Sequence, residues 1–191
     1  MAWALALLHA EVLEKLVIIN APHPAIFERE LRENPAQQRA SQYALMFRSA
    51  MAETVLSAGN YALLVQTVLS DGLKQGYLGA DDRRAYLEAW SQPGALTGGL
   101  NYYRAVPMKV SGHGGEPHPD FTSYLPRLRI EVPTLVIWGE RDIYLLTGNL
   151  EGLESYVPRL TVKRVPDGSH WIIHEKPVLV NTYLREFLEG P

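Results

Sequence analysis

The sequence contains no cysteine among its 191 residues. Disulfide bonds, thiolate nucleophiles, iron–sulfur clusters and cysteine-ligated zinc are therefore excluded. Positive charge is also scarce: 18 lysines and arginines stand against 21 aspartates and glutamates, so the formal charge is −3, and no basic block occurs along the chain. We therefore expect no nucleic-acid partner.

Long apolar runs are missing as well. Residues 1–8 are apolar, but this segment is too short to span a bilayer, and no lysine or arginine precedes it as in a secretory signal. We expect no membrane association and a cytoplasmic location. The 47% of hydrophobic and 20% of charged residues are typical of a folded globular protein with a sizeable core.

Short apolar runs rich in β-branched residues predict three buried strands, at 16–19, 134–138 and 160–165. The last two are separated by a helix-length segment at 148–156, and this order is typical of a right-handed parallel unit. Apolar residues at helical spacing predict a buried helix that starts at residue 1 and whose apolar stripe continues through Val12, Leu13 and Leu16. Further helices are expected at 27–33, 36–57, 61–70, 81–90, 94–105 and 177–188.

The order of these segments predicts an α/β fold in which a parallel sheet is interrupted by an all-helical insertion. Residues 1–24 would form the start of the core, and residues 25–118 the helical insertion. Residues 119–191 would complete the core with the last two strands and the closing helix.

Two side chains that suit proton transfer follow the last two predicted strands. Asp142 lies in the segment directly after Trp138, and His170 lies in the segment directly after Val165. Ligands of open parallel sheets bind outside the carboxyl ends of the strands, so neighbouring strands would bring these two side chains together. A carboxylate that accepts a hydrogen bond from one imidazole nitrogen leaves the other nitrogen free to take a proton from water. The pair therefore predicts a general base and its orienting acid.

Alternatives stay open at both positions. Glu140 and Asp167 are rival acids in the same segments, and Asp142 could instead cap a helix while His170 fills a turn. His174 forms a His-x-x-x-His pair with His170, but the glutamate of the zinc-binding H-E-x-x-H motif is missing. We expect no metal and no cofactor.

Several segments together resemble one protein family. They are Trp3-Ala-Leu-Ala6, Glu14-Lys-Leu-Val-Ile-Ile-Asn-Ala-Pro-His-Pro24, Pro93-Gly-Ala-Leu-Thr-Gly-Gly-Leu-Asn-Tyr-Tyr-Arg104, Trp138-Gly-Glu-Arg-Asp142, Gly168-Ser-His-Trp171 and Glu175-Lys-Pro177. On these segments the chain resembles the α/β-hydrolases over nearly all of its length, and within them the epoxide hydrolases. The resemblance implies a partial α/β-hydrolase fold, with a remnant of the parallel sheet and an inserted all-helical cap.

Two tyrosines carry the specific part of this resemblance. Tyr103, in Asn101-Tyr-Tyr-Arg104, takes the place of a tyrosine in the cap domain of epoxide hydrolases, and Tyr43 matches the other cap tyrosine less distinctively. The resemblance implies that both tyrosines donate to the oxygen of an opening epoxide, and a phenol with a pKa of about 10 is a suitable donor. Ordinary packing on helices is the alternative for both residues.

The resemblance also implies a two-step hydrolysis of a small apolar epoxide. An aspartate opens the ring to give an ester, and water activated by His170 and Asp142 then hydrolyses the ester. In this family the aspartate lies on a sharp turn directly before the helix that residues 1–8 resemble, and the sequence contains no such turn. We therefore expect a C-terminal fragment that lacks the nucleophile, is inactive by itself, and self-associates through an open edge of the strand at 16–19.

Three alternative functions stay open. A haloalkane or haloacid dehalogenase would share the fold and the histidine but needs halide donors such as tryptophan rather than a pair of tyrosines. Another α/β-hydrolase, such as a serine esterase, would differ at the absent turn. A non-catalytic remnant would bind a small apolar ligand under its helices without turning it over.

Overall fold

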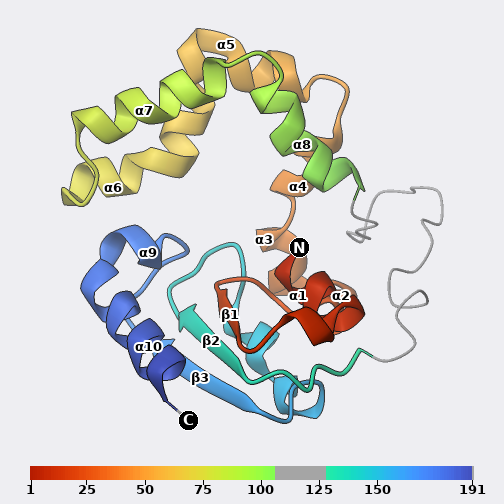
Figure 1. The fold of residues 1–191 in the computed structure, drawn as a ribbon. Coiled ribbons are helices and arrows are strands. Elements are labelled where there is room, and N and C mark those ends of the chain that lie inside the picture. The colour runs from red at the N-terminus through yellow and green to blue at the C-terminus, as the bar shows by residue number, and fades with distance from the viewer. Residues whose placement is uncertain (106–127, 191) are drawn as a thin grey trace. The chain divides into compact units, whose positions relative to one another are not determined.

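The computed structural model describes residues 1–105 and 128–190. Its contacts divide the chain into two compact units. The sheet unit comprises Met1–Ser41 and Pro107–Pro191, and the helical unit comprises Gln42–Val106. Figure 1 shows the strands of the first unit and the helices of the second.

The sheet consists of β1 (Leu16–Ile19), β2 (Thr134–Gly139) and β3 (Leu160–Val165) in the order β1-β2-β3. Both strand pairs are parallel, and the residue that opens β2 is opposite the residues that open β1 and β3. The three strands and their parallel arrangement confirm the sequence prediction. Because the strands are parallel, their carboxyl ends lie at one edge of the sheet.

The two faces of the sheet are covered by different helices. Alternate residues of a strand face opposite sides, so Leu16 and Ile18 of β1 pack in one cluster, with Trp3 from α1 (Ala2–Leu8) and Ile26 from α2 (Pro24–Glu33). Val17 and Ile19, the other two residues of β1, pack against a second cluster that contains Val180 from α10 (Pro177–Glu189). Helix α9 (Ile172–Glu175) contributes to this second cluster as well. β1 and β2 are therefore covered on both sides, as a parallel sheet requires, whereas Thr161 and Arg164 of β3 are exposed at the edge of the sheet.

Two helices that the sequence predicted in the sheet unit differ in the structure. The first helix ends at Leu8 because the backbone leaves the helical region at His9, and a 3₁₀ turn, η1 (Ala10–Val12), leads toward β1. Val12 is 65% exposed, so the predicted apolar stripe does not continue through it. The predicted helix at 148–156 is also wrong: two 3₁₀ turns, η4 (Thr147–Leu150) and η5 (Leu153–Ser155), flank Gly152, whose φ of +76° a helix cannot include.

The helical unit contains α4 to α8. These elements are α4 (Tyr43–Arg48), α5 (Ala52–Leu64), the π-helical segment η2 (Val65–Leu69), α6 (Ser70–Gln75), α7 (Ala80–Ser91) and α8 (Ala95–Ala105). The backbone of α5 leaves the helical region from Ala58 to Tyr61, where the sequence predicted a gap between two helices. The long helix predicted at 36–57 is wrong, because α3 (Pro35–Ala40), α4 and α5 divide this range. Ala52, Leu56, Leu64 and Leu100 form the buried core of the unit.

The boundary of the helical unit differs from the predicted insertion at 25–118. Helices α2 and α3 group with the sheet because their side chains are buried there: Ile26 is 1% exposed and Gln37 is fully buried. The predicted boundary at 118 and 119 lies outside the described residues. Among the residues that the structure describes, no helix is long and apolar enough to cross a membrane.

Candidate active site

The segments that follow β2 and β3 bring Asp142 and His170 into direct contact. Nδ1 of His170 lies 2.7 Å from Oδ2 of Asp142. The positions of these residues directly after neighbouring parallel strands predicted this contact, and the structure confirms it. Their catalytic role stays a prediction.

Asp142 is held as an acceptor on both of its carboxylate oxygens. Its Oδ1 accepts hydrogen bonds from the backbone N–H groups of Tyr144 (2.8 Å) and Leu145 (2.9 Å), while Oδ2 faces His170. The residue is only 4% exposed. Because an ionised carboxylate can only accept, Nδ1 of His170 carries the proton and donates, and Nε2 is left as the basic nitrogen. The pair can therefore take a proton from a water molecule at Nε2.

The rival acids are engaged elsewhere. Glu140 forms an ion pair of 3.0 Å with Arg164, and Asp167 forms one of 2.6 Å with Lys176. The hydrogen bond from Lys176 also lowers the pKa of Asp167. Asp142 is therefore the acid that the structure pairs with His170.

Two glycines allow the loops after β2 and β3 to approach each other. A Cβ at Gly139 would clash with the backbone carbonyl oxygens of Gly168 and Ser169, and a Cβ at Gly168 would lie 3.3 Å from Cα of Gly139. The N–H group of Arg141 donates to the carbonyl of Gly168 at 2.9 Å across this contact. Side chains at either position would push the acid and the histidine apart.

Asn20, directly after β1, links the end of β2 to the segment that follows β3. Its backbone N–H donates to Ile137 of β2 at 3.1 Å. The side-chain Oδ1 accepts from the N–H of Gly139 at 2.8 Å, and Nδ2 donates to the carbonyl of Ser169 at 2.8 Å. The sequence analysis used the segment around Asn20 to end the first strand and for the family resemblance, and assigned this residue no function. Its place directly after a buried strand was the available signal.

Gln37 of α3 is a second support that sequence reasoning missed. Its Nε2 donates to the carbonyl of Tyr144 at 2.7 Å, and its Oε1 accepts from the N–H of Leu146 at 2.9 Å and from Nδ2 of Asn149 at 2.8 Å. These bonds fix the chain that follows Asp142. A polar residue within a helical pattern gave no sequence signal for this role, because such residues are usually exposed.

A cavity of about 230 Å³ lies against the histidine in the sheet unit. It is lined by Ile19, Asn20, His170, Trp171, Ile173 and His174. The described residues contain no cluster of three or more side chains that could hold a metal ion. The volume of the cavity is sufficient for water molecules or part of a small substrate to reach His170.

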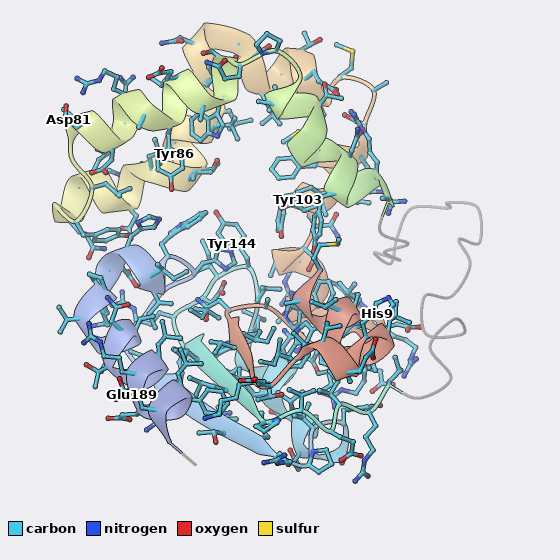
Figure 2. All side chains as sticks on the ribbon, viewed as in Figure 1. His9, Asp81, Tyr86, Tyr103, Tyr144 and Glu189 are labelled. Atoms are coloured by element: carbon cyan, nitrogen blue, oxygen red, sulfur yellow. The ribbon has the colours of Figure 1, made fainter. Side chains whose placement is uncertain are left out.

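The ring of Tyr144 packs edge-on against the ring of His170, with 5.2 Å between the ring centroids, and Figure 2 shows Tyr144 in the sheet unit. Burial, and to a lesser extent the charge of Asp142, raises the pKa of Tyr144. Its phenol therefore stays protonated at neutral pH.

The two predicted tyrosines meet within the helical unit. Tyr43 of α4 and Tyr103 of α8, which Figure 2 labels, are both half-buried, and their rings pack edge-on with 6.0 Å between the centroids. Phe47 contacts both rings, at 5.4 Å and 4.9 Å. Arg104, the neighbour of Tyr103, binds Glu53 of α5 through two contacts of 2.7 Å. The structure thus brings the two tyrosines together, and their role as donors stays a prediction.

Proteins of known sequence match nearly the whole chain. "Epoxide hydrolase 4" from Mus musculus is 31% identical, and the match covers 98% of this chain and 50% of that protein. "AB hydrolase superfamily protein YfhM" from Bacillus subtilis (strain 168) is 35% identical, and the match covers 99% of this chain and 62% of that protein. The chain therefore spans about half to three-fifths of the length of these relatives.

Solved structures match to a similar extent. An epoxide hydrolase from Bacillus megaterium, in complex with an inhibitor, is 34% identical with a TM-score of 0.85, over 98% of this chain and 65% of that one. A potato epoxide hydrolase is 20% identical with a TM-score of 0.73 and shows likeness of fold alone. The family model described as "alpha/beta hydrolase fold" matches residues 1–177. Together with the parallel sheet and the paired acid and histidine, this match shows that the chain belongs to the alpha/beta hydrolase fold family.

Proposed function

We propose that this chain is part of an epoxide hydrolase, an enzyme that converts a small apolar epoxide to a diol. The observation that carries the proposal is the 2.7 Å contact between His170 and Asp142, which leaves Nε2 of the histidine as a base for water. The names of the relatives and of the solved structures support the choice of substrate class. Two adjacent tyrosines in the helical unit also support it, because an opening epoxide needs hydrogen-bond donors.

The proposed reaction has two steps. In the first, an aspartate carboxylate attacks a ring carbon, the C–O bond of the epoxide breaks, and the released oxygen takes a proton. In the second, Nε2 of His170 takes a proton from water while the water oxygen attacks the ester carbonyl. The bond between the carbonyl carbon and the diol oxygen then breaks, that oxygen takes the proton of the new carboxyl group, and the aspartate is released as a carboxylate. The proton on His170 passes through solvent to the phenol that was deprotonated in the first step. Asp142 stabilises the imidazolium that forms in the second step.

We assign the proton of the first step to Tyr43 and Tyr103. Two phenols can share the charge that develops on the epoxide oxygen, and each would donate from the protonated form that is usual at neutral pH. The contact between their rings supports a joint role.

No residue among the 191 is assigned as the nucleophile, and we propose that the chain by itself hydrolyses no epoxide. A carboxylate held at the ring carbon supplies the proximity on which most of the rate depends, and the His170–Asp142 pair cannot replace it. Self-association through the edge of β1 and a cytoplasmic location belong to the same proposal and stay predictions.

The test compares two proteins, the 191-residue chain and the longest in-frame product of its gene that contains the chain. Diol formation from styrene oxide is expected only from a product that includes a nucleophile. His170→Gln in that product should stop the reaction at the ester, which mass spectrometry of the intact protein would detect. Release of chloride from a chloroalkane would instead indicate a dehalogenase, and turnover by His170→Gln without an adduct would refute the role of the histidine.

A further inference from the structure

Asn20 lies at the ends of β1 and β2 and reaches the segment after β3, where the candidate site is formed. We infer that Asn20 is a positioning residue for the His170–Asp142 pair, acting through the backbone on either side of that pair. The catalytic consequence of this inference rests on the proposed function, whereas the geometric part concerns the histidine and the acid alone.

The orientation of the Asn20 amide is fixed by its partners. The N–H of Gly139 can only donate and the carbonyl of Ser169 can only accept, so Oδ1 must face Gly139 and Nδ2 must face Ser169. Both bonds are 2.8 Å long, and Asn20 is only 5% exposed. One rigid amide therefore sets the separation between the end of β2 and the segment after β3 that leads to His170.

These two contact points lie next to the acid and the histidine. The carbonyl of Gly139 accepts from the N–H of Asp142 at 3.2 Å, so Gly139 opens the turn that carries the acid. Ser169 directly precedes His170. A change in the separation of these points would alter the distance between Nδ1 and Oδ2, and small misplacements of catalytic groups are costly in rate.

The backbone of Asn20 is part of the same arrangement. Its φ of +43° lies in the left-handed region, which asparagine tolerates better than other residues with a side chain, apart from aspartate. Glycine adopts this conformation freely. Asn20→Gly therefore removes the amide and keeps the backbone, so it separates the role of the side chain from strain in the main chain.

Asn20 acts through other groups rather than on the substrate. It lines the cavity beside His170, but its acceptor oxygen and one amide proton are already used in bonds to the backbone. This arrangement points to a positioning residue and not to a catalytic one.

The first experiment measures the ring nitrogens of His170 by ¹⁵N NMR in the 191-residue chain. We expect the unsubstituted chain to show the Nδ1–H tautomer with a strongly deshielded proton shared with Asp142. Asn20→Gly should lose that proton signal and shift the tautomer toward Nε2–H. The matched control is Thr134→Val, which removes a buried hydroxyl bonded to the carbonyl of Val132 at the other end of β2, and should lower stability without moving the His170 signals.

A folded Asn20→Gly variant with unchanged His170 signals would overturn the inference. If this variant does not fold, Asn20→Asp decides by the same measurement, because it keeps the acceptor for Gly139 and replaces the donor to Ser169 with a carboxylate oxygen that faces the same carbonyl. Unchanged signals in a folded Asn20→Asp variant would overturn the inference as well, and loss of the shared proton would support it.

The second experiment uses single turnover of styrene oxide by the longest in-frame gene product. Asn20→Gly should slow hydrolysis of the ester by about 10- to 100-fold and change its formation by less than about 2-fold. Equal slowing of both steps would refute a specific action on the His170–Asp142 pair. If no form of the protein opens an epoxide while the NMR signals shift as expected, the proposed function fails and the positioning role stands.

Discussion

In the sheet unit the candidate acid and histidine are fixed by hydrogen bonds, whereas in the helical unit the candidate tyrosines meet through the edges of their rings. Asp142 accepts from two backbone N–H groups and from His170, and Gln37 of α3 binds the backbone that follows it. Tyr43 and Tyr103 pack with Phe47 at centroid distances of 4.9 to 6.0 Å. Hydrogen bonds hold heavy atoms within a few tenths of an ångström, while edge-on ring contacts allow a wider range of distances.

This difference matches the proposed chemistry of the two groups. A general base works only within about 2.6 to 3.2 Å of its partner, so Asp142 and His170 must be held in fixed positions. Two donors that share one developing charge can compensate for each other in part. We therefore expect substitutions in the sheet unit to cost more activity than substitutions of either tyrosine.

The largest effect is expected for Asp142→Asn in the longest in-frame gene product. An amide at this position favours the wrong tautomer of His170, so ester hydrolysis should slow by about 10³- to 10⁴-fold, in line with loss of the acid in a serine protease triad. Single-turnover kinetics would measure this step. Glu140→Gln is the matched control, because this rival acid binds Arg164 instead, and a comparable loss in the control would contradict the assignment.

A smaller effect is expected for Tyr103→Phe in the same protein. Loss of one of two donors should slow ester formation by about 10- to 1,000-fold and leave ester hydrolysis less affected. Tyr43→Phe should act in the same way. The control is Tyr102→Phe, since Tyr102 is adjacent in sequence and 54% exposed, and it should leave ester formation unchanged. Unchanged ring opening in both single variants and in the double variant would return the tyrosines to a packing role.

A buried histidine should make the stability of the sheet unit sensitive to acid. His23 is fully buried between the rings of Trp3 and Tyr156, and this burial lowers its pKa from 6.5 to about 4, against a smaller opposing effect of the Leu128 backbone. The unfolded chain therefore binds more protons between these pH values, so the stabilisation is complete above pH 6.5 and is lost as the pH falls toward 4.

His23→Phe should remove this pH dependence while keeping an aromatic ring in the same site. Between pH 7.5 and 4.5, the free energy of unfolding of the 191-residue chain should fall by roughly 2 to 3 kcal/mol less in the variant than in the unsubstituted chain. Urea denaturation at both pH values would measure the difference. His9→Phe is the control, because the side chain of His9 is 61% exposed, and it should leave the pH dependence as it is.

The smallest effect is expected at the ion pair of the helical unit. The hydrogen bond from Arg104 lowers the pKa of Glu53 from 4.5 to about 2, so the stabilisation is present above pH 4.5 and is lost as the pH falls toward 2. Glu53→Gln should lower the protection of α8 from hydrogen exchange at pH 7, and the difference should vanish near pH 2. Asp81→Asn is the control, because its pair with Arg84 is exposed on both sides and should contribute little.

The two units should respond to acid at different pH values. The sheet unit should loosen between pH 6.5 and 4, and the ion pair of the helical unit should fail only below pH 4.5. Hydrogen exchange of peptides from β2 and α8 at pH 5 would measure both units in one sample. Earlier loss of protection in α8 than in β2 would reverse the expected order.

The local sequence was sufficient to predict an element wherever its pattern fits only one kind of secondary structure. The apolar β-branched runs at 16–19 and 134–138 could be buried only as strands of a parallel sheet, and the mixed run at 160–165 pairs beside them. The positions of Asp142 and His170 followed from the ends of those strands. The sequence by itself also determined the absence of thiol chemistry and the break near Ala58.

The tertiary structure alone decided which polar groups support the site. Choosing Asp142 over Glu140 and Asp167 depended on ion pairs with Arg164 and Lys176, which lie on other elements. The bonds of Asn20 to Gly139 and Ser169 join residues 119 and 149 positions apart. Hydrogen bonds at such separations leave no periodic signal along the chain, because a side chain's partner is fixed only after the strands have paired and brought their ends together.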